Sequence, residues 1–207
     1  MSLKMELPKM KSLGVMPHFM LWNLGLAKAW TYYGAEECAS LEKYAAGKKC
    51  LVEIGCWQGV NTRRLRSVMG EDAVLFAVDP YPAGRLGFSA PEMIAHKEVD
   101  QVRRGKMEWI KLTDLEAALH WKENNLEPAD FIFSDSLNTY EGLQASFNAW
   151  SPLLKEGGIY IIANSRSTPQ RNMDDAGSVL FTKEVIAHDA RFKVLDPAGS
   201  FTILKRL

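Results

Sequence analysis

The sequence has few cysteines and no surplus of charge of either sign. Three Cys occur in 207 residues, and two of them, Cys50 and Cys56, bracket one short segment, which is an unlikely geometry for a disulfide bridge. We therefore expect a reducing, cytoplasmic environment rather than a secreted, disulfide-stapled domain. Lys+Arg and Asp+Glu both total 25, so the formal net charge is zero. This balance excludes a strong field that gathers nucleic acid or an anionic membrane from a distance.

Long hydrophobic runs are also missing. The most apolar early stretch, residues 19–30, has about 12 residues and contains Asn23 and Lys28, whereas a membrane-spanning helix needs about 20 apolar residues. Pro17 and His18 interrupt any apolar signal-peptide core, so we expect no secretory leader. Apolar residues still make up 47% of the chain, enough for one domain with a sizeable core.

From residue 50 onward, short apolar runs alternate with helical patterns. Runs rich in Val, Ile and Phe, bounded by Gly, Pro or Asp, predict strands at 50–54, 74–79, 107–112, 131–133 and 159–163. Between them, helical spacing predicts one helix whose face includes Leu143, Phe147, Trp150 and Leu154 and which Pro152 ends early. It also predicts one whose face includes Leu115, Ala118 and Leu119 after a Thr113 or Asp114 cap, and one after residue 174. This alternation favours a mostly parallel sheet with helices on both faces.

The two ends of the chain depart from that rhythm. Apolar runs at 192–196 and 200–205 are separated by three residues, too few for a helix, so they predict an antiparallel hairpin at the sheet edge. The whole is then an α/β fold with a seven-stranded, mostly parallel sheet. Residues 1–49 predict a helical extension, with Cys38, Leu41 and Ala45 as one buried stripe. We expect this extension to cover the cleft of a ligand-binding domain formed by residues 50–207.

A glycine-containing turn, EIGCWQG at residues 53–59, follows the first predicted strand. Gly55 permits a positive φ, and Gly59 permits close approach of the backbone to a ligand or to the sheet. A helix that starts near Asn61 and Thr62, whose side chains can cap it, would present free N–H groups at its N-terminus. Taken alone, the segment fits a plain strand-to-helix turn as well as a ligand site.

Asp79 ends the second predicted strand, 20 residues after Gly59. An acidic residue at about this spacing accepts hydrogen bonds from a ribose diol in nucleotide-binding folds. The alternative is an ordinary strand-end Asp that starts a turn before Pro80. Together, the turn and the carboxylate favour a ligand of the adenosine type.

These residues resemble class I S-adenosylmethionine-dependent methyltransferases, through Glu53-Ile54-Gly55 with Gly59 and through Val78-Asp79-Pro80. An acidic residue two positions before the first glycine suits the amino group of a methionine moiety. It would repel a pyrophosphate, which disfavours an NAD-dependent oxidoreductase. Trp57 replaces the middle glycine, which is typical of one subgroup. The resemblance implies a Rossmann-like fold, S-adenosylmethionine as cofactor, and cofactor contacts from Glu53, Gly55, Trp57, Gly59 and Asp79.

The segment FIFSDSLNTYEG at 131–142 looks like the IDGDHSYEG segment of small O-methyltransferases related to macrocin O-methyltransferase and the cephalosporin hydroxylase methylating enzymes. Residues 150–159 are similar to the run that leads into their fifth strand. The resemblance implies methyl transfer to a small-molecule acceptor, most often at a hydroxyl oxygen. It further implies that Thr113 and Asp114 contact the adenine, that Tyr81 is a candidate to stack on it, and that Asp135 touches cofactor or acceptor.

The chain departs from these relatives at the two strand ends that hold Mg²⁺ in their metal-dependent members. Leu137 and Asn138 stand where those members have an Asp and a His, and Ala163-Asn164 stands where they have His-Asp. Only Asp135 keeps a carboxylate. Because Mg²⁺ prefers charged oxygen ligands, we expect no metal site.

Asp135 is therefore the leading candidate to remove the acceptor proton, and Asn138 the candidate to orient the acceptor. His18 and His96 lie in segments that can fold over the site, and each is an alternative base. The lost polar positions leave a second hypothesis open, a non-catalytic protein of the same fold that binds S-adenosylmethionine or a nucleotide. A homodimer is compatible with the sequence, which does not name the acceptor.

Overall fold

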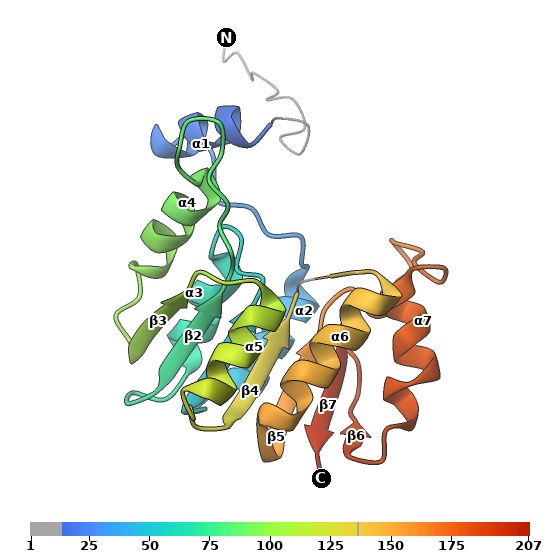
Figure 1. Ribbon diagram of the computed structural model, residues 1–207. Coiled ribbons are helices and arrows are strands. Elements are labelled where there is room, and N and C mark those ends of the chain that lie inside the picture. The colour runs from blue at the N-terminus through green and yellow to red at the C-terminus, as the bar shows by residue number, and fades with distance from the viewer. Residues whose placement is uncertain (1–13, 136) are drawn as a thin grey trace.

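The computed structural model describes residues 14–135 and 137–207, and its centre is one seven-stranded sheet (Figure 1). The strands are β1 (Cys50–Ile54), β2 (Val74–Val78), β3 (Lys106–Ile110), β4 (Ala129–Ser134), β5 (Leu154–Ile162), β6 (Phe192–Val194) and β7 (Thr202–Arg206). Their order across the sheet is β3-β2-β1-β4-β5-β7-β6, and the first five are mutually parallel. β7 runs antiparallel to both β5 and β6, so the predicted fold class and terminal hairpin are confirmed.

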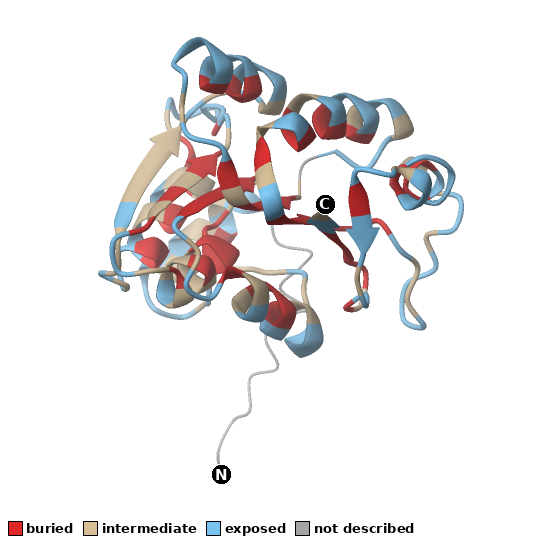
Figure 2. Ribbon diagram, turned by 90° about the horizontal axis from the view of Figure 1, so that it is seen from below, coloured by how far each residue is buried: buried red, intermediate tan, exposed pale blue. Residues whose placement is uncertain are grey.

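Helices cover both faces of the sheet, with their buried sides turned inward (Figure 2). The α-helices of the described residues are α1 (Val15–Asn23), α2 (Ala35–Ala45), α3 (Val60–Val68), α4 (Ala90–Val99), α5 (Asp114–Glu123), α6 (Tyr140–Trp150) and α7 (Gly177–Glu184). α5, α6 and α7 pack on one face, against side chains such as Val52 and Ile132. α2 and α3 pack on the other face, against their strand neighbours Leu51 and Phe131. Successive strand residues thus face opposite layers, and both layers are apolar.

Two details of the helix predictions are wrong. α6 ends before Pro152, as predicted, but Leu154 does not lie on its face; it opens β5, five residues before the predicted strand start. In α5 the buried face consists of Ala117, Ala118 and Trp121, whereas Leu115 and Leu119 are exposed. The Thr113 cap is confirmed as a capping box with Glu116.

The N-terminal segment contributes to the core and extends beyond it. Cys38, Leu41 and Ala45 of α2 are buried, as predicted. α1 lies against α4 and stands away from the sheet, at the top of Figure 1. Within residues 14–135 and 137–207, no helix combines the length and apolarity needed to cross a membrane.

The turn after β1 depends on Gly59, which takes the left-handed conformation (φ 72°) and is the N-cap of α3. The helix begins at Val60, and no side chain caps it, so Asn61 and Thr62 do not cap it as predicted. A Cβ on Gly59 would lie 2.8 Å from Cα of Ala95 in α4. The glycine therefore allows both the turn and the close packing of α4 on it.

We predict that Gly59→Ala destabilises the fold more than Gly157→Ala. Both glycines have a φ of 72°, so each substitution costs about 1–2 kcal/mol in left-handed backbone. At Gly157 nothing lies within 4 Å of an added Cβ, whereas Gly59→Ala also forces Ala95 to move, at about 1–3 kcal/mol more. Denaturant unfolding of both variants measures the difference, and equal losses of stability would contradict it.

Candidate functional site

Backbone hydrogen bonds align the carboxyl ends of the central strands. The residue after each strand donates its N–H to the last carbonyl of the neighbouring strand. These bonds are Gly55 N to Val78 O (2.9 Å), Asp79 N to Ile110 O (3.2 Å), Asp135 N to Ile54 O (2.8 Å) and Ala163 N to Ser134 O (2.9 Å). Gly55, Asp79 and Asp135 are thereby brought side by side at one edge of the sheet, although they are far apart in the sequence. Ligands of open α/β sheets bind at this edge.

A cavity of about 420 Å³ opens at these strand ends, and we call it the strand-end cavity. Its lining includes Gly55, Asp135 and the α5 start at Thr113 and Asp114. Leucine side chains complete the walls, among them Leu115 and Leu137, which are 50% and 55% exposed. Leu115 therefore faces a cavity rather than the core, which explains the wrongly predicted face of α5.

Asp79 ties the glycine turn to β2. Its Oδ2 accepts the N–H groups of Cys56 (3.1 Å) and Trp57 (2.9 Å), and its Oδ1 accepts that of Tyr81 (3.0 Å). Gly55 has a φ of 87° and Trp57 a φ of 46°, so these bonds hold two left-handed residues in place. Each carboxylate oxygen has two lone pairs, and Oδ1 keeps one for a further donor.

Tyr81 and Asp79 line a second cavity, of about 430 Å³, with Trp57 and the start of α1; we call it the α1 cavity. Tyr81 is buried, and its ring packs near Trp109 (6.2 Å between centroids). Of the predicted site residues, Gly55, Thr113, Asp114 and Asp135 therefore line the strand-end cavity, whereas Asp79 and Tyr81 line the α1 cavity.

Glu53 lies inside the sheet, fully buried beneath the turn. Burial raises the pKa of its carboxyl to about 8, while the nearby Thr62 hydroxyl lowers it and the charges of Asp135 and Asp79 raise it further. Neither carboxylate oxygen has a well-formed hydrogen bond within the described residues. Glu53 is thus a proton-holding group next to the turn rather than a side chain exposed in the cavity.

A polar cluster surrounds Asp135 at the ends of β4 and β5. Asn164, with a φ of 51°, donates its Nδ2 to Oδ1 of Asp135 (3.1 Å) and to the hydroxyl of Tyr33 (3.3 Å). The Tyr33 hydroxyl in turn hydrogen-bonds to Asp135. On the other side, Nη1 of Arg171 donates to Oδ1 of Asn164 (2.9 Å). The amide of Asn164 therefore links a carboxylate to a guanidinium.

The environment of Asp135 keeps its carboxyl near the point of ionisation. Burial raises its pKa to about 7, against the hydrogen bonds from Tyr33 and Asn164 and the charge of Arg171, which lower it. Burial and the same carboxylate raise the pKa of Tyr33 far above its ordinary value, so Tyr33 stays a donor. A carboxyl with a pKa near 7 suits proton transfer at neutral pH.

A third cavity, of about 640 Å³, lies on the far side of this cluster. Its walls include Tyr32 and Tyr33 from the segment before α2, Asn164, and Arg166 and Arg171 from the loop after β5; we call it the arginine cavity. Asp135 lines the strand-end cavity, and its partners Tyr33 and Asn164 line the arginine cavity. The polar cluster is therefore the boundary between the two.

The remaining candidates lie elsewhere. Asn138 is exposed, and its carbonyl accepts the N–H of Ser178 (3.0 Å). His18 is buried, stacks on Trp30 (3.7 Å between centroids) and pairs its Nε2 with the side chain of Gln58 (3.2 Å). His96 stacks on Trp109. Neither imidazole lines any of the three cavities, as far as the described residues go.

Among the described residues, no group of three or more His, Cys, Asp or Glu is placed to hold a metal ion. Asn164 directs its amide nitrogen to Asp135 and its oxygen to Arg171. The amide oxygen of Asn164, just after β5, thus faces a cation already.

Sequence reasoning missed Tyr33, Arg171 and the cavity leucines. Tyr33 comes from a segment about 100 residues before Asp135, and no local pattern marks the pair. Arg171 lies in an irregular loop without a motif. For Leu115 a signal existed, because Ala117, Ala118 and Trp121 form an alternative core face that leaves Leu115 outside it.

The comparisons with known proteins agree with this geometry. A family model described as a methyltransferase domain matches residues 52–165, more than half of the chain. The matched region contains the glycine turn, Asp79 and the ends of β4 and β5. No curated protein matches the chain.

Several solved structures share the fold. The O-methyltransferase TomG of Streptomyces achromogenes, in complex with SAM, has a TM-score of 0.65 at 15% identity and is covered over 92% of its chain by 99% of this one. An O-methyltransferase of Bacillus cereus, in complex with SAH, has a TM-score of 0.63 at 18% identity, with 98% of this chain and 94% of that one covered. An rRNA methylase of Streptococcus thermophilus has a TM-score of 0.56 at 14% identity, with 83% and 94% covered. These structures share the fold of this chain, and by its matched region the chain belongs to the methyltransferase domain family.

Proposed function

We propose that this protein transfers a methyl group from S-adenosylmethionine to a hydroxyl oxygen of a small molecule. One observation carries the proposal: Asp135, with a pKa near 7, stands with Tyr33 and Asn164 at the boundary between two cavities. A donor in the strand-end cavity and an acceptor in the arginine cavity would then meet at a group able to take a proton.

The residues of the strand-end cavity suit S-adenosylmethionine. Leu112, Leu115 and Leu137 offer apolar walls for a purine, and Thr113 and Asp114 offer polar atoms at its edge. Three carboxyls, Glu53, Asp79 and Asp135, lie around the turn. Burial raises the pKa of Glu53, and the charges of Asp135 and Asp79 raise it further. Such a group favours a ligand that carries positive charge, as a sulfonium and an ammonium do.

S-adenosylmethionine, when bound, supplies an electrophilic methyl group to the acceptor oxygen. The chain itself aligns and protects the reacting groups. Asp135 takes the proton of the acceptor hydroxyl, and Tyr33 and Asn164 stabilise the carboxylate that does so. Asn138 is a weaker proposal as the orienting group, since it lies on the exposed loop after β4.

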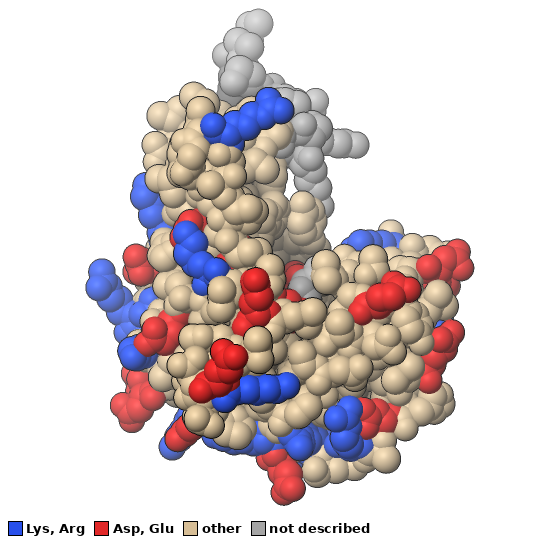
Figure 3. Space-filling view, viewed as in Figure 1, with Lys and Arg blue, Asp and Glu red and all other residues tan. Residues whose placement is uncertain are grey.

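A small acceptor is favoured over a nucleic acid by charge and shape. Figure 3 shows Lys and Arg interspersed with Asp and Glu over the visible face, without a basic stripe. The formal net charge is zero. A notch separates the part built on α1 and α4 from the part that carries α6 and α7 (Figure 3). A cavity of about 640 Å³ has the size of a small-molecule site.

Two measurements test the proposal. Calorimetry with S-adenosylmethionine, S-adenosylhomocysteine and NAD should give saturable binding for the first two only. Formation of S-adenosylhomocysteine should then be followed with a panel of hydroxylated small molecules and with short RNA. Binding without turnover on any acceptor would favour the non-catalytic alternative, and methylation of RNA alone would reject the small acceptor.

We predict that Asp79→Asn binds S-adenosylhomocysteine about tenfold more weakly than the parent, because the ribose loses a charged acceptor. The amide keeps one oxygen for the turn N–H groups of Cys56 and Trp57, so the fold should persist. The matched control is Asp130→Asn, since Asp130 accepts the N–H groups of Lys49 and Cys50 at the opposite edge of the sheet. Calorimetry should show unchanged affinity for the control. Equal affinities in all three proteins would reject the ribose role.

The reaction rate is predicted to rise with pH through a limb near 7, because Asp135 accepts a proton only when ionised. The Tyr33 hydrogen bond favours the ionised form, so Tyr33→Phe should move this limb to higher pH. The measurement is the pH profile of S-adenosylhomocysteine formation under kcat/KM conditions for the acceptor. A limb that stays in place in Tyr33→Phe would show that Asp135 is not the titrating base.

Turnover is expected to be independent of divalent metal. Arg171 donates a hydrogen bond to the amide oxygen of Asn164, and its positive charge repels a dication beside Asp135. Rates should be equal after exhaustive chelation and with excess Mg²⁺ or Mn²⁺. Loss of most activity on chelation, with recovery on adding metal, would overturn the expectation.

A further inference from the structure

The arginine cavity carries charged groups that the transfer reaction itself does not use. Arg166 and Arg171 both line it, five residues apart on the loop after β5, and both are exposed there. Arg171 donates one hydrogen bond from Nη1 to Oδ1 of Asn164, and its guanidinium group has further N–H donors. Within the described residues, Arg166 makes no ion pair or hydrogen bond. Two guanidinium groups thus stand at one cavity without a carboxylate partner.

The acidic residues of the same cavity do not neutralise this pair. Oε1 of Glu37 accepts the N–H (2.9 Å) and the hydroxyl (2.6 Å) of Ser200, and Oε2 accepts the N–H of Gly34 (2.8 Å). Glu36 lies beside it in the first turn of α2, where the helix dipole stabilises a negative charge. Both carboxylates thus lie at the α2 end of the cavity, and the loop end, which carries Arg166 and Arg171, is positively charged.

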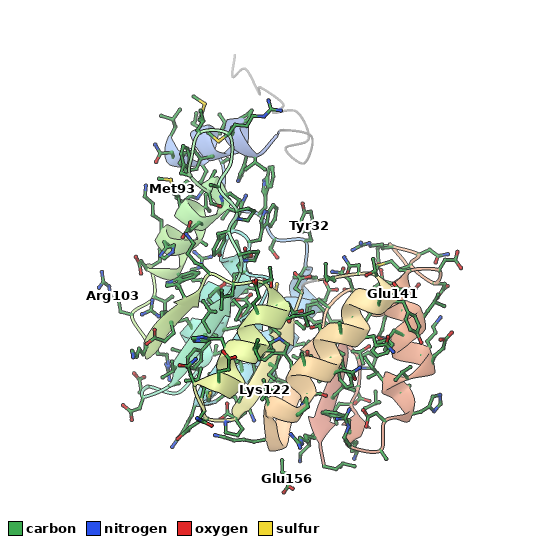
Figure 4. All side chains as sticks on the ribbon, viewed as in Figure 1. Tyr32, Met93, Arg103, Lys122, Glu141 and Glu156 are labelled. Carbon is green, nitrogen blue, oxygen red and sulfur yellow. The ribbon has the colours of Figure 1, made fainter. Side chains whose placement is uncertain are left out.

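The opposite wall is aromatic. Tyr32 is 62% exposed and stacks on Trp57 of the glycine turn, with ring centroids 5.1 Å apart and an angle of 11° between the rings. Figure 4 shows Tyr32 on the segment between α1 and α2, facing the open space above the sheet. A molecule in this cavity would meet an aromatic wall, two guanidinium groups and, beyond Asn164, the carboxyl of Asp135.

We propose that the methyl acceptor is a hydroxylated acid, held through its carboxylate or phosphate by Arg166 and Arg171. Guanidinium groups bind such oxyanions through paired hydrogen bonds, which fix orientation as well as charge. The hydrogen bonds from Arg171 through Asn164 to Asp135 run from the anion site to the proton acceptor. A hydroxyl at the other end of the same small molecule is thereby directed toward Asp135. This inference rests on the proposed function, since it assigns the acceptor of that reaction.

Binding of matched probes tests it without turnover. The probes are 4-hydroxybenzoate, 4-hydroxyphenyl phosphate and the neutral 4-hydroxybenzamide, titrated into protein saturated with S-adenosylhomocysteine and followed by NMR. We expect at least one acidic probe to bind saturably and about tenfold more tightly than the amide. The stronger acidic probe tells a carboxylate acceptor from a phosphate. An amide that binds as tightly as both acids, or no saturable binding by either acid, would overturn the proposal.

Three variants locate the effect. Arg166→Gln removes a side chain without a partner in the described fold, and Arg171→Gln removes the one bonded to Asn164; each should weaken the acidic probe about tenfold. Arg103→Gln, at the far edge beside β3 (Figure 4), removes the same charge away from the cavity and should leave probe binding unchanged. Equal weakening by all three would indicate general charge attraction and overturn the proposal.

Calorimetry with S-adenosylhomocysteine distinguishes a failure of the anion-site proposal from a failure of the proposed function. Unchanged cofactor affinity in the arginine variants, together with lost acid binding, supports the anion site. A parent protein that fails to bind S-adenosylhomocysteine would instead reject the proposed function.

Discussion

The site depends on the last backbone hydrogen bond between each pair of neighbouring strands. Gly55, Asp79 and Asp135 each donate their backbone N–H to the last carbonyl of the neighbouring strand. The three loops that begin at these residues therefore start at the same edge of the sheet. A one-residue shift of register would move each of these side chains to the other face of the sheet. The apolar layers on both faces oppose such a shift, because alternate residues of the central strands, such as Leu51 and Val52, are buried in opposite layers. Core packing therefore determines where the polar groups of the site lie.

The cost of that arrangement is a concentration of negative charge. Glu53 is buried, and its pKa is raised first by burial and then by Asp135 and Asp79. A proton on Glu53 relieves part of this repulsion. Because the folded state holds this proton between its ordinary pKa and about 8, the contribution of Glu53 to stability falls as the pH rises through that window. A cationic ligand would relieve the same repulsion, which links cofactor binding to the protonation of a residue under the turn.

The sequence predicts the sheet better than the polar cluster, for physical reasons. Strand runs such as 50–54 and the turn at Gly55 and Gly59 are local signals, and the three residues between the last two predicted strands leave room only for a hairpin. Leu154 was misassigned because helical spacing continues across Pro152 even though the backbone cannot. Tyr33 comes from the segment before α2, whereas Asn164 and Arg171 belong to the loop after β5, and nothing in their local sequence marks their meeting. The match to the methyltransferase family model, over residues 52–165, includes Asp135 and Asn164 but neither Tyr33 nor Arg171.

The position of β7 has a consequence for the order of folding during synthesis. β7 lies between β5 and β6, and its antiparallel bonds are what join β6 to the sheet. The chain makes β6 first, so this strand has no place in the sheet until Thr202–Arg206 have left the ribosome. Until then the edge of β5 stays unpaired and open to other chains. A nascent chain paused between β6 and β7 therefore carries a complete glycine turn beside an unprotected sheet edge, and recruitment of a chaperone would matter most at that stage.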